Sequence, residues 1–520
     1  MGKARMSAIP TSERVGTSVA VAATSVPASG RFAVSRWWIL VLGAAGAAIT
    51  FVGAGVPSYW GDEAASVLSA QRPLGSLLAE LTHVDAVHGV YNLFLHFWTG
   101  AFGTTEAVVR FPSAVAAGAA VAGTVALGRQ LVGARAALVA GIVACAIPQL
   151  TRMAIEARSY AFGMAAAVWL TWLLVLLIRR RERRRRIWAL YVIGLALSIW
   201  LFVYLGLMVL VHLVVVLVER PERSVARRWV LSVAIALAAC LPIAAFAVAQ
   251  HDQIAYLAHR NYATALNVLV HQWFRIWYVA VIAWTLIVIG IVTSRRPRGA
   301  VSPSTRRGMT VVAAWIVLPT AVLLAGNAWL APMYNLRYLS FCVPAIALAM
   351  GQGIVATASV LHHASVRRAL VAALVAGVVA ASVPSFLAQR TPYAKDGGSD
   401  LRQLAVAVQT HAAAGDAIVF GESVVPRLKP RLALDLYPSS FSGIDDVALV
   451  TPYAERAGLW DAVAPLESLR SRLAGHEVVW AAEPKHGEAD DLRLLRDQGY
   501  QVVDTVSIHR TVLYQLRRTP

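Results

Sequence analysis

The chain has 520 residues, of which 58% are hydrophobic and 14% charged, and its mean hydropathy is +0.61. This composition excludes an ordinary water-soluble protein, in which about a quarter of the residues are charged. The formal net charge of +19 does not indicate nucleic acid as a partner, because much of the Lys and Arg occurs in short runs between apolar segments. We therefore expect a membrane protein whose basic loops contact membrane lipids.

Apolar segments of about 20 residues, the length that crosses a bilayer as a helix, recur along most of the chain. Before the first of them, residues 1–36 are rich in Ala, Ser, Thr, Val and Gly, which predicts a disordered cytoplasmic tail. The region 37–390 predicts a polytopic all-α membrane domain of about eleven transmembrane helices, near 37–56, 112–132, 135–151, 160–178, 187–202, 204–218, 229–249, 274–293, 309–328, 337–357 and 369–388.

The basic loops set the predicted orientation, because short cytoplasmic loops carry an excess of Lys and Arg. A further apolar stretch, 86–103, would place the arginine-rich run from Arg179 to Arg186 outside if it crossed the membrane. We therefore predict that 57–103 lies outside and carries amphipathic helices on the bilayer surface. The N-terminus is then cytoplasmic, and the external segments are 57–111, 152–159, 250–273, 329–336 and the chain beyond about 389.

The composition changes near the C-terminus, where charged and apolar residues alternate between turn formers. A helix is predicted over 401–411, and strands are predicted over 417–420, 477–481 and 500–507. Residues 391–520 are therefore expected to form a soluble extracytoplasmic α/β domain.

Acidic residues are concentrated just after the first predicted span, in the sequence Trp60-Gly61-Asp62-Glu63. Charges beside lipid cost free energy unless water, a cation or a substrate compensates them, so Asp62 and Glu63 are candidate catalytic residues. A solvated loop with a helix N-terminus is the alternative explanation. The same loop continues through Asp85, His88 and Tyr91, which add titratable and hydrogen-bonding groups.

Three arginines lie at predicted external helix ends, against the usual distribution of positive charge. These residues, Arg110, Arg158 and Arg337, require anionic partners, which are either a ligand phosphate or the carboxylates of Asp62, Glu63 or Glu156. Metal ligands are not predicted. The spacing of His83, Asp85 and His88 is weak evidence for a metal, and the cysteines Cys145, Cys240 and Cys342 lie in apolar segments without zinc-type spacing.

Several short motifs in succession resemble those of membrane glycosyltransferases with the C-type fold (GT-C), in the family-39-like branch of protein O-mannosyltransferases and the lipid A aminoarabinose transferase. The resemblance covers roughly residues 37–390. The motifs are Trp60-Gly61-Asp62-Glu63, His88-Gly89-Val90-Tyr91, Arg110-Phe111-Pro112-Ser113, Glu156-Ala157-Arg158-Ser159-Tyr160-Ala161 and Arg337-Tyr338-Leu339. The chain departs from that family after His88, where two prolines commonly follow.

This resemblance implies a polyprenyl-phosphate sugar as donor and an inverting transfer to an acceptor outside the membrane. Asp62 would be the general base, and Glu63 would position the acceptor or tune the charge of the site. The carrier phosphate would be held by Arg158, Arg337 and Arg110, while His88, Tyr91, Glu156, Tyr160, Tyr338 and Asp85 would contact substrates. No cofactor is obligatory, although a divalent cation is possible.

The Ala- and Arg-rich composition further suggests a bacterial plasma membrane. A mannose or arabinose-like sugar would then be transferred to a cell-envelope glycan, glycolipid or protein. A transporter or lipid flippase is the alternative from another class. Such proteins often contain inverted repeats, and the sequence has no convincing internal repeat.

Overall fold

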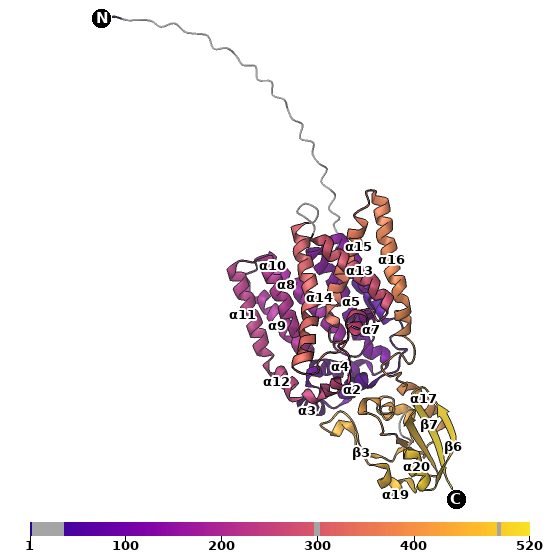
Figure 1. Cartoon of the computed structure of the whole chain (residues 1–520). Helices are drawn as coiled ribbons and strands as arrows, with labels where there is room; N and C mark the ends of the chain where they lie inside the picture. The colour runs from indigo at the N-terminus through magenta and orange to yellow at the C-terminus, as the bar shows by residue number, and fades with distance from the viewer. Residues whose placement is uncertain (3–35, 296–301, 486–489, 520) are drawn as a thin grey trace. The chain divides into compact units, whose positions relative to one another are not determined.

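The computed structural model describes residues 1–2, 36–295, 302–485 and 490–519 (Figure 1). Residues 3–35 of the predicted cytoplasmic tail lie outside this part of the chain. The described residues from position 36 onward form one compact unit. Within it, helices occupy the sequence up to Ala388, and a small mixed sheet follows.

Each predicted span corresponds to a helix or to a pair of consecutive helices. These are α1 (Arg36–Phe51), α5 (Glu106–Leu131), α6 (Ala134–Ala144) with α7 (Pro148–Met153), α8 (Tyr160–Arg179), α9 (Arg185–Leu201), η2 (Val203–Leu207) with α10 (Met208–Glu219), α11 (Arg223–Ala239) with α12 (Leu241–Ala249), α13 (Trp277–Ser294), α14 (Pro303–Trp329), η5 (Ser340–Cys342) with α15 (Val343–Ala358), and α16 (Ala364–Ala388).

Six of these helices are long and apolar enough to cross a membrane, or seven if the pair α11 and α12, bent by 45°, forms one span. These counts refer to the described residues and rest on length and composition. The multi-pass membrane class is confirmed, whereas the number eleven stays a prediction. The first loop is helical, as expected, with α2 (Gly61–Gln71), α3 (Leu74–His83), η1 (Ala86–His88) and α4 (Gly89–Phe102). The predicted external loop 250–273 contains η3 (His251–His259) and η4 (Asn267–His271).

Small residues let the apolar helices approach closely, which is how helices associate where lipid offers no hydrophobic driving force. A Cβ at Gly118 of α5 would lie 2.5 Å from the carbonyl oxygen of Gly43 in α1. A Cβ at Gly353 of α15 would overlap the carbonyl oxygen of Leu286 in α13. Both helix pairs therefore depend on glycine at the point of contact.

We expect Gly353→Ala to lower the free energy of unfolding by about 1–3 kcal/mol, because backbone rather than a mobile side chain opposes the new methyl group. Gly377→Ala is the matched control, since nothing lies within 4 Å of a Cβ at that position of α16. There the substitution should be neutral or stabilising by about 0.5–1 kcal/mol. Thermal unfolding of the detergent-solubilised variants measures both effects. Equal melting temperatures would contradict the close approach of α13 and α15.

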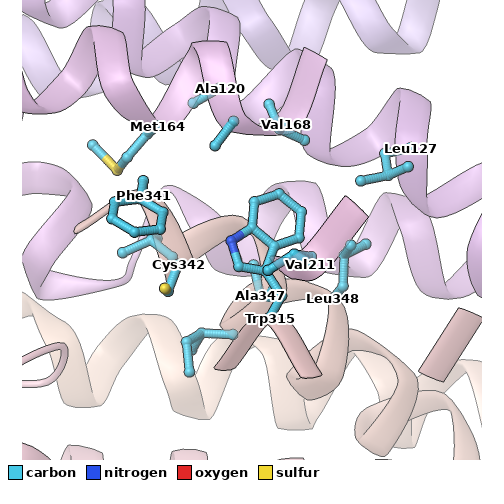
Figure 2. Packing of buried hydrophobic residues seen from close by; sticks show 14 of the residues in the cluster. Ala120, Leu127, Met164, Val168, Val211, Trp315, Phe341, Cys342, Ala347 and Leu348 are labelled. Carbon is cyan, nitrogen blue, oxygen red and sulfur yellow. The ribbon is translucent and has the colours of Figure 1, made fainter. Parts of the chain in front are cut away.

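A large apolar cluster joins the helices, and Figure 2 shows Trp315 of α14 near its middle. The indole is fully buried and is surrounded by side chains from other segments, including Val168 of α8, Val211 of α10 and Leu348 of α15. This packing fixes the helix ends relative to one another, and the loops at those ends carry the polar residues.

The C-terminal region contains a five-stranded sheet in the order β2-β1-β5-β7-β6. The strands β2 (Asp445–Asp446), β1 (Ala417–Phe420) and β5 (Val478–Pro484) are parallel, whereas β7 (Thr511–Arg518) is antiparallel to β5 and to β6 (Tyr500–Ser507). A second, two-stranded sheet pairs β3 (Leu449–Thr451) with β4 (Ala462–Val463), and the helices are α17 (Leu401–His411), α18 (Leu432–Leu436), α19 (Arg470–Leu473) and α20 (Asp490–Asp497).

The predicted helix 401–411 and the predicted strands 417–420 and 500–507 are present with the same bounds as α17, β1 and β6, and the predicted strand 477–481 corresponds to β5. The described residues thus contain the predicted small α/β arrangement. Its boundary at 391, and its position outside the membrane, stay predictions.

Candidate functional site

One cavity of about 190 Å³, here called the Asp62 cavity, gathers most of the predicted site residues. Its lining comes from the first loop, from the ends of α8 and α9, from η3 and from the segment before α15. The predicted residues among the lining are Asp62, Asp85, His88, Arg158, Tyr160, Arg337 and Tyr338. Segments that are far apart in the sequence therefore meet around one polar hollow.

The two adjacent carboxylates of the first loop point in different directions. Asp62 and Glu63 lie in the first turn of α2, where the helix dipole favours negative charge. Consecutive helical residues are rotated by about 100° from one another. The side chain of Asp62 is 21% exposed and lines the cavity, whereas that of Glu63 is fully buried.

Glu63 forms an ion pair with Arg110, whose side chain is also fully buried. Nε and Nη2 of Arg110 donate to the two carboxylate oxygens over 2.8 and 2.6 Å. The remaining donors of this guanidinium reach the carbonyl oxygens of Ala54, Pro57 and Ser58. Arg110 and Glu63 therefore connect the end of α1, α2 and α5, and neither lines the cavity. The structure thus favours the ion-pair alternative over a phosphate role for Arg110.

Arg337 is the cation that faces Asp62. Its Nη1 lies 3.0 Å from a carboxylate oxygen of Asp62 and 3.0 Å from one of Glu156. The guanidinium also lies over the rings of Trp60 and Tyr160, with centroid distances of 4.7 and 5.8 Å. Stacking of this kind suits a delocalised planar cation. Arg337 is therefore held in one position at the wall of the cavity.

Arg158 contributes a second guanidinium, which lies 3.4 Å from a carboxylate oxygen of Asp85. Burial would raise the pKa of the Asp85 carboxyl, but the neighbouring His88 and Arg158 hold that pKa below its ordinary value. Burial lowers the pKa of His88 to about 4, despite the opposing charge of Asp85 4.0 Å away. At neutral pH the imidazole is uncharged, so Arg158 and Arg337 supply the positive charge at this cavity.

The pKa of His88 makes stability depend on pH. As the pH falls below the ordinary value of 6.5, unfolded chains bind a proton at this imidazole and folded chains do not until about pH 4. The free energy of unfolding should therefore decrease over this window, by up to about 3 kcal/mol. Thermal melts of the purified protein at pH 7 and pH 5 measure the slope, and His88→Asn should flatten it. A variant with the unchanged slope would contradict this assignment.

Aromatic side chains form another wall of the Asp62 cavity. Tyr338 stacks on Tyr204 at a centroid distance of 4.8 Å, and Phe202 contacts both Tyr160 and Tyr338. Tyr256 of η3 also lines the cavity. The guanidinium of Arg427, in the C-terminal region, lies over the Tyr256 ring at 5.1 Å from its centroid. Such a wall offers flat apolar faces of the kind that sugar rings and isoprenoid chains contact.

Sequence reasoning missed Phe202, Tyr204 and Gln250. Phe202 ends the predicted span 187–202 and Tyr204 begins the predicted span 204–218, positions where aromatic residues are also ordinary interfacial anchors. Gln250 lines the cavity and orders the first loop, because its side chain accepts from the backbone N–H of Ala86 and donates to the carbonyl oxygen of Leu81. For Gln250 the available signal was the polar predicted loop 250–273, which did not single out this position.

Two predicted substrate-binding residues do not line the Asp62 cavity. Tyr91 is fully buried in an apolar cluster and packs against Phe94 and Phe162. Glu156 is buried behind Arg337 and acts on the cavity through that ion pair. Burial would raise the pKa of Glu156, but the charges of Arg337 and Lys395 hold it below its ordinary value.

Within the described ranges, no group of three or more His, Cys, Asp or Glu side chains is arranged to hold a metal ion. The free cysteines Cys145, Cys240 and Cys342 are likewise separate from the cavity lining. Whether a divalent cation takes part stays a prediction.

Comparisons with known proteins support the resemblance that the sequence motifs indicate. A family model described as dolichyl-phosphate-mannose-protein mannosyltransferase matches residues 89–246, which is less than a third of the chain. A search of curated proteins found no match.

Among solved structures, ArnT from Cupriavidus metallidurans bound to undecaprenyl phosphate is similar, with a TM-score of 0.58 and 13% identity. The similarity covers 92% of this chain and 98% of ArnT, and the apo state of ArnT gives a TM-score of 0.57 at 12% identity. The mycobacterial arabinofuranosyltransferase AftD gives 0.49 at 17% identity over 93% of this chain and 40% of AftD. The likeness to ArnT over nearly the full length shows a common fold, and the resemblance stated from the sequence motifs is confirmed.

Proposed function

We propose that this chain, a multi-pass membrane protein with the C-type glycosyltransferase fold, transfers a sugar from a polyprenyl-phosphate carrier to an acceptor hydroxyl at the Asp62 cavity. One observation carries the proposal. A partly exposed carboxylate and two guanidinium groups, those of Asp62, Arg158 and Arg337, line the same cavity beside an aromatic wall. These are the groups that a displacement at an anomeric carbon requires.

In the proposed step, the acceptor oxygen attacks the anomeric carbon while the bond from that carbon to the carrier phosphate breaks. Asp62 takes the proton of the acceptor hydroxyl as general base. The electron pair of the broken bond leaves with the phosphate, and Arg158 and Arg337 offset its growing negative charge. A single displacement inverts the anomeric configuration and involves no covalent intermediate on the protein.

The donor class is supported by two printed descriptions of similar proteins. The matching family model is named for dolichyl-phosphate mannose, and the similar ArnT structure contains undecaprenyl phosphate. We extend the proposal to a mannose or arabinose-like sugar and to a cell-envelope acceptor outside a bacterial plasma membrane. Asp85 and His88 then contact the donor beside Arg158, while Tyr160 and Tyr338 contact the sugar or the first isoprenoid units. Glu63 and Arg110 are assigned to holding α2 in place rather than to substrates.

The test is to incubate purified protein with prenyl-phosphate mannose, arabinose and aminoarabinose, and to measure which donor is consumed. Arg158→Gln should raise the KM for the consumed donor by about 10–100-fold, because it removes a charged hydrogen-bond donor to the phosphate. Arg260→Gln, at an exposed arginine of the neighbouring loop, is the matched control and should leave KM unchanged. A defect confined to the acceptor would contradict the phosphate role of Arg158. Consumption of no donor would favour the transporter or flippase alternative.

A further inference from the structure

A second cavity, of about 420 Å³, is lined by two arginines, Arg152 and Arg275. Both arginines are half-buried, and both also line a smaller adjoining cavity of about 150 Å³. Arg152 belongs to α7, and Arg275 lies just before α13. Neither residue takes part in the chemistry assigned to the Asp62 cavity.

In the part of the chain that the structure describes, the carboxylates of Glu156 and Asp396 attract both arginines electrostatically, but Glu156 forms its ion pair with Arg337 and neither carboxylate pairs with Arg152 or Arg275. Among the described residues, no carboxylate oxygen lies within 4 Å of either guanidinium, and neither makes a side-chain hydrogen bond. Asp396 lines the smaller cavity without reaching that distance, and Lys395 of the larger cavity already faces Glu63 at 3.6 Å. Like charges this close oppose each other: the charge of Arg152, and then burial, lower the pKa of Arg275 to about 10.

The backbone at Arg275 is also unusual for this residue type. Its φ is +63°, a conformation in which glycine is favoured and a bulky side chain is rare. Two adjacent guanidinium groups that form no ion pair with a carboxylate match the geometry of a phosphate, which can accept several parallel N–H bonds.

The rest of the lining indicates that the phosphate belongs to a lipid. The cavity lies where α13 begins and α16 ends, and both helices are apolar enough to span a membrane. Ile155, Ile276, Pro384 and Ala388 give it apolar walls. Only 17% of the apolar window of α16 is buried inside the protein, so the surface of this helix is left open to lipid.

This cavity is separate from the Asp62 cavity. The two share no lining residue among those described, and only Arg337 lines both the Asp62 cavity and the smaller adjoining one. Arg337 is itself held between Asp62 and Glu156. The Arg337–Glu156 pair would therefore lie between a phosphate bound at Arg158 and a second phosphate bound at Arg152.

We propose that Arg152 and Arg275 bind the phosphate of a second lipid, distinct from the sugar donor, at the membrane-facing end of α13 and α16. This inference rests on the proposed function only in assigning the donor phosphate to Arg158 and Arg337. The second lipid has two possible sources with the same chemistry, an acidic lipid acceptor or a carrier phosphate that has lost its sugar.

The first experiment counts bound dodecyl phosphate on the full-length protein by native mass spectrometry from detergent. The wild type and the control Arg260→Gln should bind two molecules, and Arg152→Gln/Arg275→Gln should bind one, with affinity at the lost site reduced at least ten-fold. Arg152→Lys/Arg275→Lys, which keeps the charge, should bind the second molecule more weakly than the wild type but measurably, which separates binding from loss of folding. Two molecules on the Gln double variant would overturn the inference.

Arg158→Gln distinguishes this inference from the proposed function. If Arg158→Gln binds two molecules while the Arg152/Arg275 variant binds one, the donor assignment fails and the second site stands. The expected result is that Arg158→Gln binds one molecule, and that protein, loaded at its remaining site, identifies the source by competition. Displacement by farnesyl phosphate supports a spent carrier, and displacement by phosphatidylinositol supports an acidic lipid acceptor. Displacement by neither, or equally by dodecanol, would overturn the lipid-phosphate assignment.

Discussion

Asp62→Asn should reduce sugar transfer by about 10²–10⁴-fold while leaving folded yield and melting temperature close to those of the wild type. The amide keeps the size of the side chain but cannot take the proton of the acceptor hydroxyl, and loss of a general base typically has this magnitude. Little loss of stability is expected, because the side chain is partly exposed and Arg337 keeps its contact with Glu156. Initial rates with the donor identified in the panel are the measurement.

Asp252→Asn is the matched control, since the side chain of Asp252 is 91% exposed in η3 and does not line the Asp62 cavity. It should retain the full rate. A folded Asp62→Asn protein with an unchanged rate would remove Asp62 from the mechanism, and the general base would have to be sought elsewhere.

Glu63→Gln should behave in the opposite way and destabilise the fold by about 3–5 kcal/mol. The change leaves the Arg110 guanidinium fully buried without its charged partner, and removal of one member of a buried ion pair has this cost. Arg110→Gln should have a similar effect. Folded yield by size-exclusion chromatography and the thermal midpoint report both variants.

The double variant Glu63→Gln/Arg110→Gln tests the pairing directly. It should be less destabilised than the sum of the single changes, by about 1–3 kcal/mol, because neither charge is then left alone. Additive losses would contradict the pairing. A well-folded Glu63→Gln protein without transfer activity would instead restore Glu63 as a catalytic residue.

The contrast between Asp62 and Glu63 shows what the sequence can and cannot predict. The succession of short motifs placed acidic residues and arginines on external loops, and the structure brings Asp62, Arg158 and Arg337 to one cavity. The sequence could not say which carboxylate faces a ligand, because that depends on the rotation of α2. It left Arg110 open between a phosphate and a carboxylate, and only the packing of α1, α2 and α5 distinguishes the two.

The fold, too, could be predicted from the sequence only in part. Apolar length predicted a helix at every span, and local patterning predicted α17, β1 and β6 with their observed bounds. The strand β7, which pairs with both β5 and β6, was missed because its residues do not alternate regularly between buried and exposed. The arginines Arg152 and Arg275 are far apart in the sequence and carry no motif, so their shared cavity could be found only in the structure.

The first loop and the C-terminal region are joined by contacts between residues that are synthesised at very different times. The backbone N–H of Arg402 donates to the hydroxyl of Ser58 across 344 positions of sequence, and Ser399 donates to the carbonyl oxygen of Tyr59. At a ribosomal rate of about 5–20 residues per second, the loop that carries Asp62 waits roughly 20–70 s for these partners. The loop that carries Asp62 therefore leaves the ribosome well before its partners, and its packing is completed only after residue 402 has been translated.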